Sequence, residues 1–553
     1  MSIRKRSKRL LIALGAGTLL ASSGLVVSAS VAAQTEDEPR QQRNAVAKRP
    51  AGSLDWAPCE AQNLAGLECA TLQVPLNYDE PDGQTIEVAV SRLASANPQE
   101  RRGVLLTNPG GPGGAGRSMP LLLAQAGMPA SVLDSYDIIG FDPRGIEQST
   151  PVTCGWNQQD LLNYLPTHAA GPQDVAEREQ TVQALGEKCA NADNNGVLPH
   201  VNTPNTARDM DQIREALGEE KVSYFGVSYG SYLGAVYAQL FPQRSDRILL
   251  DSVIGPEMVW RDEFRLFGLG AELRFPDFAK WAAARDATYE LGETPKQVRA
   301  TFQRLAGQLD EEPVQGVDGT LFRWQVFNWT YADAQFPALA QFMQAVDRAD
   351  GETAEQLLAE HTERAESRSR AQQQLPPDHY QAAQNAVLCN DVAWPDSVAH
   401  YQRAVQQDSK RFPLVGSVMG NMWTCAGWSL GQVEEPVRID DSVSSEVLLL
   451  QNVRDPATTY PGAVQMRAAM GDRSRLVTVD DGGHGVFVLG DNACGNNVAT
   501  AFLVDGEMPD GDEFCAANTD PTAAPFRNNP DRKEAVLDFH ARNGLVGLAT
   551  QSR

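Results

Sequence analysis

One short segment constrains the fold of this chain more than any other. It reads Gly226-Val227-Ser228-Tyr229-Gly230, and it stands between the apolar run Val222–Phe225 and a helix-forming stretch at residues 231–238. A strand that enters a very tight turn and leaves it as a helix exposes a serine at the turn, where flanking glycines avoid collisions. We therefore expect Ser228 to be a nucleophile.

A second match to the same pattern lacks this context. It reads Gly427-Trp428-Ser429-Leu430-Gly431, and Met422–Cys425 precedes it while Pro436 follows soon after. Neither a strand nor a helix is evident on its two sides. We interpret Ser429 as part of a loop near a disulfide.

Short apolar runs alternate with helical stretches along most of the chain. Thr206–Leu217, for example, has apolar residues at helical spacing. Strands that are apolar almost throughout indicate a parallel sheet covered by helices on both faces. The pattern therefore predicts an α/β fold with a mostly parallel sheet. The expected strands are Ala70–Val74, Ile86–Leu93, Val104–Thr107, Tyr136–Phe141, Val222–Phe225, Arg247–Leu250, Val447–Leu450 and Arg475–Val479.

The alternation stops between about residues 257 and 440, where helical periodicity continues with little strand signal. Because strand-like runs resume afterwards, we expect a helical lid inserted between strands of the sheet. The predicted core then has a first part at 54–256 and a C-terminal part at 441–553, with the lid at 257–440.

The N-terminus has the layout of a secretory signal peptide. Basic residues at positions 4–9 precede an apolar stretch at 10–27 and then small residues, with Val27-Ser28-Ala29 and Val31-Ala32-Ala33 as possible cleavage sites. We predict a signal peptide at 1–33 and a flexible leader or pro-segment at 34–53. The alternative is an N-terminal membrane anchor, because the apolar stretch is nearly long enough to span.

Net charge and cysteine content agree with export. The net charge is −24, so no basic surface is available for nucleic acid, and we expect no stable membrane insertion after signal cleavage. An even number of cysteines without a CxxC pair favours disulfides in an oxidising compartment over a zinc site; some free buried thiols are the alternative. Sequence alone cannot select the connectivity, and we expect nearest-neighbour pairs: Cys59–Cys69, Cys154–Cys189, Cys389–Cys425 and Cys494–Cys515.

The glycine-rich run after Val104–Thr107 is the candidate oxyanion hole. Residues 108–116 read Asn-Pro-Gly-Gly-Pro-Gly-Gly-Ala-Gly. Glycines let backbone N–H groups approach a developing oxyanion, and preorganised donors stabilise it strongly. We expect the N–H groups of Gly111 and Tyr229, with Gly110 as the open alternative to Gly111. A phosphate-binding loop is disfavoured because neither GxGxxG nor Gly-Lys-Ser/Thr is present.

The base and its acid partner should follow the serine in the order acid, then histidine. His484 lies in a glycine-rich loop after Arg475–Val479, and Asp455 follows Val447–Leu450. Strand carboxyl ends are where such sheets place their chemistry. His540 reads as a helical packing or surface histidine.

These motifs together resemble a known group of enzymes. Pro109–Gly113, Asp142–Ser149, the Ser228 turn, Asp455-Pro456 and Gly483–Gly485 are similar to the prolyl iminopeptidase-type branch of the α/β-hydrolases. More narrowly, residues 54–545 resemble the secreted tripeptidyl aminopeptidases of actinobacteria. Further likeness lies in Trp56, Cys69–Pro75 and Cys389–Asp391.

The chain departs from the usual pattern at two places. Glu147 stands where the Asp-x-Arg-Gly segment usually continues with glycine, and we expect a local change in the loop. Asn108-Pro109 stands where prolyl iminopeptidases have histidine, which disfavours narrow proline specificity and favours a peptidyl aminopeptidase.

The resemblance implies an α/β-hydrolase fold and an exopeptidase that cuts short peptides from a free N-terminus. Ser228 would attack, His484 would move the proton, and Asp455 would orient the imidazole. A lid acid should pair with the substrate ammonium; Asp391 is the candidate, and a structural role for it is the alternative. The expected substrates are peptides or proteins with free N-termini, and no metal or organic cofactor is needed.

Two other functions use the same sequence features. A secreted carboxylesterase or lipase-like hydrolase would have the same three residues, although this lid is rich in charged residues and glutamine, which points away from lipid. A non-catalytic binding protein on a hydrolase scaffold is the other alternative, but such proteins typically lose one of the three.

Overall fold

The computed structural model describes residues 54–192, 194–314, 316–366, 375–432, 434–518 and 529–543. The predicted signal peptide (1–33) and leader (34–53) lie outside the described residues. Within those ranges, no helix combines the length and the apolar character that crossing a membrane requires.

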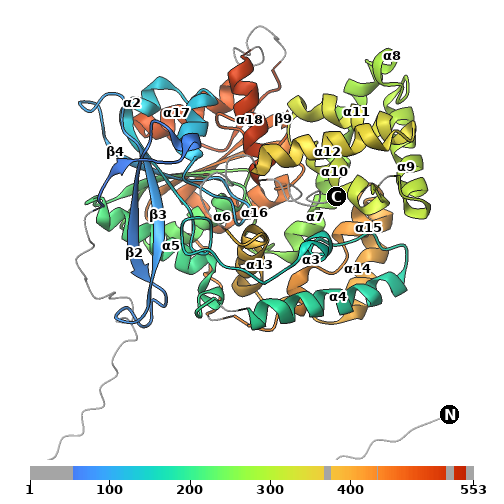
Figure 1. Ribbon diagram of the computed structural model, residues 1–553. Coiled ribbons are helices and arrows are strands. Elements are labelled where there is room, and N and C mark those ends of the chain that lie inside the picture. The colour runs from blue at the N-terminus through green and yellow to red at the C-terminus, as the bar shows by residue number, and fades with distance from the viewer. Residues whose placement is uncertain are drawn as a thin grey trace, which may run out of the picture. The chain divides into compact units, whose positions relative to one another are not determined.

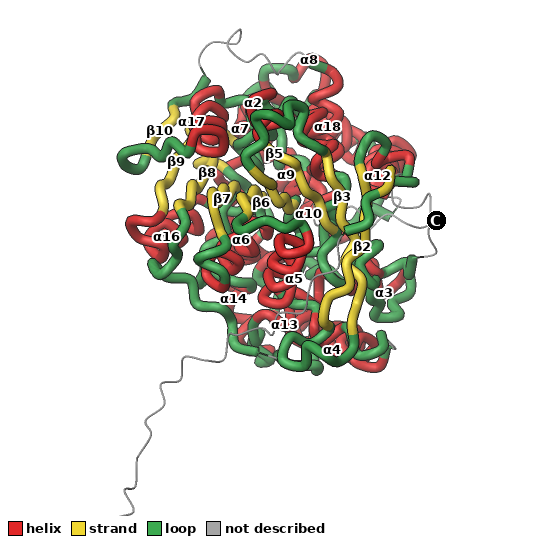
Figure 2. Tube along the Cα trace, turned by 90° about the vertical axis from the view of Figure 1, so that its left-hand side faces the viewer, coloured by secondary structure: helices red, strands yellow, loops and turns green. Residues whose placement is uncertain are grey.

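A ten-stranded sheet forms the centre of the described part of the chain (Figure 2). Its order is β1-β2-β3-β5-β4-β6-β7-β8-β9-β10. The pairs β1–β2, β2–β3 and β3–β5 are antiparallel, and all the other pairs are parallel. The α/β prediction is confirmed. All expected strands are present, and the two short edge strands β1 and β10 are additional. The strands are β1 (Ala57–Pro58), β2 (Glu68–Pro75), β3 (Thr85–Leu93), β4 (Gly103–Asn108), β5 (Tyr136–Phe141), β6 (Val222–Val227), β7 (Ser245–Asp251), β8 (Glu446–Arg454), β9 (Ser474–Gly482) and β10 (Glu513–Cys515).

Helices cover both faces of this sheet because its strands are apolar on both sides. In β7, Ile248 and Leu250 belong to one buried cluster, whereas Leu249, which points the opposite way, belongs to another. The first cluster includes residues of α5, α6 and α16, and the second includes residues of α1, α2, α17 and α18. These helices are α1 (Met119–Gln125), α2 (Ala130–Ser135), α5 (Thr203–Ala216), α6 (Tyr229–Leu240), α16 (Tyr460–Met470), α17 (Ala493–Asp505) and α18 (Pro530–Asn543).

A long helical insertion separates β7 from β8, where the sequence predicts the lid. Its helices gather on one side of the sheet (Figure 1). Aromatic residues build its interior; Phe264, for example, stacks on Trp423 with ring centroids 4.1 Å apart. The helices are α7 (Arg261–Ala283), α8 (Asp286–Tyr289), α9 (Pro295–Glu311), α10 (Gly319–Asn328), η3 (Asp333–Gln335), α11 (Phe336–Asp347), α12 (Gly351–Glu366), α13 (His379–Asp391), α14 (Val398–Arg411), α15 (Gly416–Met419) and η4 (Thr424–Gly427).

The connection between β5 and β6 also contributes to the lid, which the sequence analysis does not anticipate. It contains α3 (Gln158–Asn163), α4 (Pro172–Asn191) and η2 (Leu198–His200). Val175 and Val182 of α4 share a buried cluster with Tyr401 and Val405 of α14. The apolar face of α4 is therefore buried by the insertion and not by the sheet, although residues 54–256 as a whole are predicted to be core.

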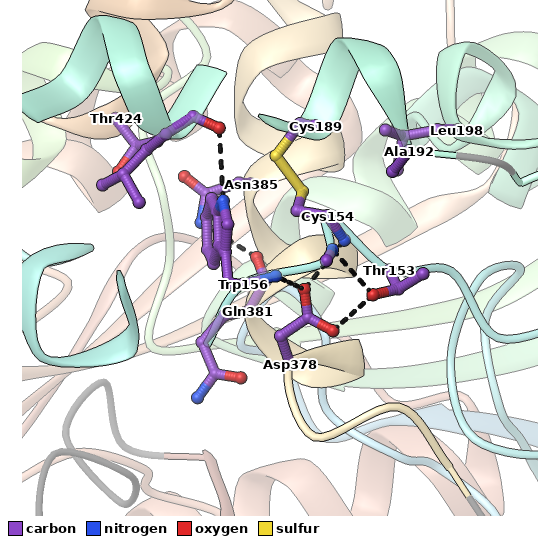
Figure 3. The surroundings of a disulfide bond; sticks show 12 residues. Thr153, Cys154, Trp156, Cys189, Ala192, Leu198, Asp378, Gln381, Asn385 and Thr424 are labelled. Carbon is purple, nitrogen blue, oxygen red and sulfur yellow. Dashed lines mark hydrogen bonds between the residues drawn. A yellow bond between two sulfur atoms is a disulfide. The ribbon is translucent and has the colours of Figure 1, made fainter. Parts of the chain in front are cut away.

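Disulfides join the cysteines that are nearest neighbours in sequence. The Cys154–Cys189 bond fixes α4 to the segment after β5, and Asp378, just before α13, accepts hydrogen bonds from Thr153 Oγ1, Cys154 N and Trp156 N at 2.5–3.0 Å (Figure 3). This carboxylate thus ties the β5–β6 connection to the lid. The four bonds are Cys59–Cys69, Cys154–Cys189, Cys389–Cys425 and Cys494–Cys515.

A buried ion pair explains part of the Asp142–Ser149 motif. The Arg144 guanidinium binds both carboxylate oxygens of Asp209 in α5, at 2.6 and 2.7 Å. Its remaining N–H groups donate to the carbonyls of Leu76, His200 and Pro75. One side chain therefore joins the loop after β5 to α5 and to the end of β2.

We predict that Arg144→Met destabilises the fold by about 3–5 kcal/mol, because it leaves the Asp209 charge buried and unpaired. The matched control is Arg208→Met: Arg208 and its partner Glu434 are 24% and 31% exposed, so the loss should be about 1 kcal/mol or less. Denaturant unfolding of both oxidised variants measures the difference. Equal losses would contradict the structural role given to Arg144.

Candidate active site

The strand, tight turn and helix expected around Ser228 are all present. β6 ends at Val227, α6 begins at Tyr229, and Ser228 between them has φ 61° and ψ −125°. The flanking residues must be glycines: a Cβ on Gly226 would lie 2.3 Å from the Gly230 carbonyl oxygen, and one on Gly230 would lie 2.7 Å from that of Asn108. A positive φ at a residue other than glycine is strained, and such strain typically marks a functional site.

Ser429 lies in a different setting. It is exposed and lies in an irregular segment just after η4, which contains Cys425 of the Cys389–Cys425 disulfide. No strand leads into it, and no helix starts from it. The structure therefore gives Ser429 none of the local geometry that presents Ser228.

The glycine-rich loop after β4 packs directly on the Ser228 turn. Gly110 has φ +99°, and a Cβ there would lie 2.6 Å from the Val227 carbonyl oxygen and 2.9 Å from the Ser228 Cβ. Its N–H donates to Asn108 Oδ1 at 3.0 Å, so this donor is already used. The Gly111 N–H makes no hydrogen bond within the described ranges. Between the two alternatives, the geometry favours Gly111.

The second candidate donor is the Tyr229 N–H, at the first position of α6. The first N–H groups of a helix have no partner within the helix and carry partial positive charge. The Tyr229 N–H directly follows Ser228, and Gly111 directly follows Gly110, which packs on the Ser228 turn. Two preorganised N–H groups are what an oxyanion hole requires, so both stay the predicted donors.

Asp142 holds the far end of the glycine-rich loop. Its carboxylate accepts hydrogen bonds from the Gly116 N–H at 3.1 Å and the Arg117 N–H at 3.2 Å, and pairs with Arg117 Nε at 2.7 Å. Glu147, in the same motif, keeps the left-handed backbone that glycine favours, with φ 42°. Glu147 thus adopts a backbone conformation that glycine would take more readily, and the expected change of this loop relative to the family stays a prediction.

Asp455 and His484 come together from neighbouring parallel strands, β8 and β9. His484 Nδ1 lies 3.0 Å from each carboxylate oxygen of Asp455. The same carboxylate accepts the N–H groups of Ala457 and Thr458 and the Thr458 hydroxyl, at 2.8–3.0 Å. Because Nδ1 faces a carboxylate, we assign its proton there, which leaves Nε2 free to accept a proton.

His540 is closer to this centre than the sequence suggests. It lies on α18, as expected for a helical residue, and is buried, with its ring centroid 6.3 Å from that of His484 and 6.0 Å from that of Tyr331. Burial and the neighbouring His484 lower its pKa to about 3, so this imidazole is neutral. Helical spacing alone gives no signal for this proximity, because it depends on how α18 packs across the end of the sheet.

Asp391 is buried and its carboxylate is already engaged. It accepts hydrogen bonds from the Thr203 N–H at 2.7 Å, Thr203 Oγ1 at 2.6 Å and Trp260 Nε1 at 3.1 Å. Thr203 Oγ1 also lies 2.9 Å from the Tyr229 hydroxyl. Burial raises the Asp391 pKa to about 7, although these hydrogen bonds oppose the rise. The residue thus joins α13 to the start of α5, beside α6.

A second buried lid acid, Glu263 of α7, has no such partners. Its oxygens lie near the Thr459 N–H without forming a hydrogen bond of ordinary geometry within the described ranges. Burial, reinforced by the charge of Asp455, raises its pKa well above the ordinary value and so favours the neutral carboxyl. Nothing in the sequence distinguishes this glutamate from the exposed acids of the lid.

Comparisons with known proteins agree with this geometry. Residues 412–515 match the protein family described as TAP-like protein. Tripeptidyl aminopeptidase of Streptomyces lividans is 32% identical over 501 residues, which are 88% of this chain and 90% of that protein. Serine protease Hip1 of Mycobacterium tuberculosis is 29% identical over 495 residues, 84% of this chain and 91% of that protein. Carboxylesterase B of Mycobacterium tuberculosis is 27% identical over 514 residues, 89% of this chain and 96% of that protein.

We predict that Gly110→Ala lowers turnover by about 100-fold or more, because its Cβ would push the glycine-rich loop away from Ser228. Gly431→Ala is the matched control: it has a similar positive φ of 73° but no atom within 4 Å of the added Cβ. It should keep activity within about twofold and lose only backbone stability, about 1–2 kcal/mol. Steady-state rates and melting temperatures of both folded variants test this, and an active Gly110→Ala would refute the contact.

Proposed function

The chain belongs to the family of tripeptidyl aminopeptidase-like α/β-hydrolases, and from this we propose that it is an exported serine exopeptidase that releases tripeptides from free N-termini. The observation that carries the proposal is the coincidence of two facts. The likeness to a named tripeptidyl aminopeptidase spans nearly the whole of both chains, and the carboxyl edge of the sheet holds a strained serine, a paired Asp–His and free N–H donors. Four disulfides support export.

The proposed mechanism uses only side chains and N–H groups of this chain. Ser228 Oγ attacks the scissile carbonyl while His484 Nε2 takes its proton, and Asp455 stabilises the imidazolium that forms. The N–H groups of Gly111 and Tyr229 bind the oxyanion of the tetrahedral intermediate. His484 then gives the proton to the leaving amine, and water releases the peptide from the acyl-enzyme in a second round.

The second candidate is carboxylesterase activity through the same residues, favoured by the likeness to Carboxylesterase B. The two functions differ in what the enzyme must recognise. An aminopeptidase needs an acid for the substrate ammonium, whereas an esterase does not. Recognition of a free amine therefore separates the two proposals better than the catalytic residues do.

We expect the purified mature protein to release anilide from a free tripeptide anilide, and to do so poorly from single-residue anilides. Ser228→Ala should lose at least about 10⁴-fold in rate, since the nucleophile is removed. Ser429→Ala, at the exposed second motif, is the matched control and should retain wild-type rates. Hydrolysis of a short acyl ester without release of any anilide would replace the aminopeptidase by the esterase.

We propose Asp391 as the acid that receives the substrate ammonium. A carboxylate offers about four acceptor positions; Thr203 and Trp260 supply three donors, so one position is left. The fraction of Asp391 that is ionised depends on pH near neutrality, because burial raises its pKa to about 7. Binding of a substrate ammonium would favour the ionised form, since an opposite charge lowers the pKa of an acid.

Asp391→Asn should therefore raise KM for a free tripeptide anilide while leaving the slow hydrolysis of its N-acetylated form unchanged. The amide keeps the shape of the carboxylate but removes the charge. The ratio of kcat/KM for the two substrates measures the discrimination in wild type and variant. A variant that loses melting temperature but keeps this ratio would assign Asp391 to structure alone.

A further inference from the structure

The residue at the end of β7 contacts both catalytic loops. The Asp251 carbonyl accepts the Ser228 N–H at 3.0 Å, which anchors the turn that presents the nucleophile. The Asp251 carboxylate accepts the Val486 N–H, at 3.0 Å from each oxygen, and the Phe487 N–H at 2.7 Å. These two N–H groups directly follow the His484 loop. Asp251 therefore contacts the backbone of the Ser228 turn and also the backbone that follows His484, the two residues between which the proton would move.

Ser252, the next residue, extends this contact. Its Oγ accepts the Gly485 N–H at 2.8 Å, and it has a positive φ of 54°. A non-glycine residue in this conformation is strained and persists only where its surroundings require it. The turn after β7 is therefore shaped to direct two side chains at the backbone of residues 485–487.

The opposite side of the loop is held as well. Asn452, at the end of β8, donates its amide to the carbonyls of Gly483 and Gly485 at 2.9 and 3.1 Å. The His484 N–H donates to the Tyr331 carbonyl at 2.8 Å. The N–H groups of residues 483–487 thus all have partners, and among the described residues Asp251 supplies the only charged one.

We propose that Asp251 is a positioning residue, whose ionised carboxylate fixes the His484 loop relative to Ser228 so that the imidazole can reach the nucleophile. It acts through backbone contacts and does not touch substrate. This inference rests on the proposed function only in assigning Ser228 and His484 as nucleophile and base.

Protonation of this carboxylate weakens the contact. Asp251 is completely buried, and burial raises its pKa to about 7, against the opposing effect of the two N–H groups and of His484. The ionisable groups that face it are His484 and Asp455. Because a protonated carboxyl accepts N–H bonds less strongly than a carboxylate, the loop should loosen as pH falls through about 7.

The experiment uses a fluorophosphonate, which labels a serine that is activated by a histidine and needs no peptide specificity. The rate constant for labelling Ser228 is measured from pH 5 to pH 9. In the wild type, loss of the base and protonation of Asp251 should together make the logarithm of the rate fall with a slope that approaches two where both groups titrate. At lower pH, where Asp251 is fully protonated, the slope should return to about one. Asp251→Asn should lower the plateau by about tenfold to hundredfold and fall with a slope of about one.

Two further variants keep the test decisive. Glu263→Gln, a buried acid near Asp455 that does not contact the His484 loop, should keep the wild-type plateau and slope. Ser252→Ala removes the Gly485 acceptor; it should lower the plateau but keep the slope that approaches two. If Asp251→Asn does not fold, as judged by its melting temperature, the inference is tested by two other results. These are the slope of the wild-type pH profile and the plateau rate of Ser252→Ala.

A wild-type slope that never exceeds one, or a folded Asp251→Asn with wild-type labelling rates, would overturn the inference. Either result would leave the proposed function intact if wild-type Ser228 still reacts. Failure of Ser228 to label in the wild type would overturn the proposed function instead, and the inference with it.

Discussion

Parallel pairing of β6 with β4 on one side and β7 on the other is the constraint on which the site depends. It brings the carboxyl ends of these strands to one edge, so the glycine-rich loop, the Ser228 turn and Asp251 become neighbours. Pairing of β7 with β8 and of β8 with β9 then adds Asp455 and His484 to the same edge. Backbone hydrogen bonds between buried strands hold these residues together at the edge of the sheet.

Buried acids surround this edge, and each is stabilised in a different way. Asp455 accepts four donors, His484 Nδ1 among them. Asp251 accepts two backbone N–H groups and the Ser252 hydroxyl, and Glu263 has no ordinary hydrogen bond within the described ranges. Burial without full compensation raises an acid's pKa, because the charged form loses its hydration. Burial thus raises the pKa of Asp251 to about 7 and that of Glu263 well above its ordinary value.

The local parts of this arrangement follow from the sequence. The apolar runs predict the strands. The glycines around Ser228 predict the turn because an apolar run precedes them and a helix-forming stretch follows, a context that the same spacing around Ser429 lacks. Long-range packing is what the sequence conceals. The apolar face of α4 gives no sign that it meets α14 and not the sheet. Asp251 looks like any acid at the end of a strand, and His540 like any helical histidine, until the fold places them beside His484.

The central claim is that Ser228 carries a tripeptidyl group during turnover. Rapid acid quenching of the enzyme with a free tripeptide ester, followed by mass spectrometry of the digested protein, would detect that acyl-enzyme directly. We predict a mass increase of one tripeptidyl group on the peptide that contains Ser228. An adduct of a single residue, or an adduct on the peptide that contains Ser429, would contradict the claim.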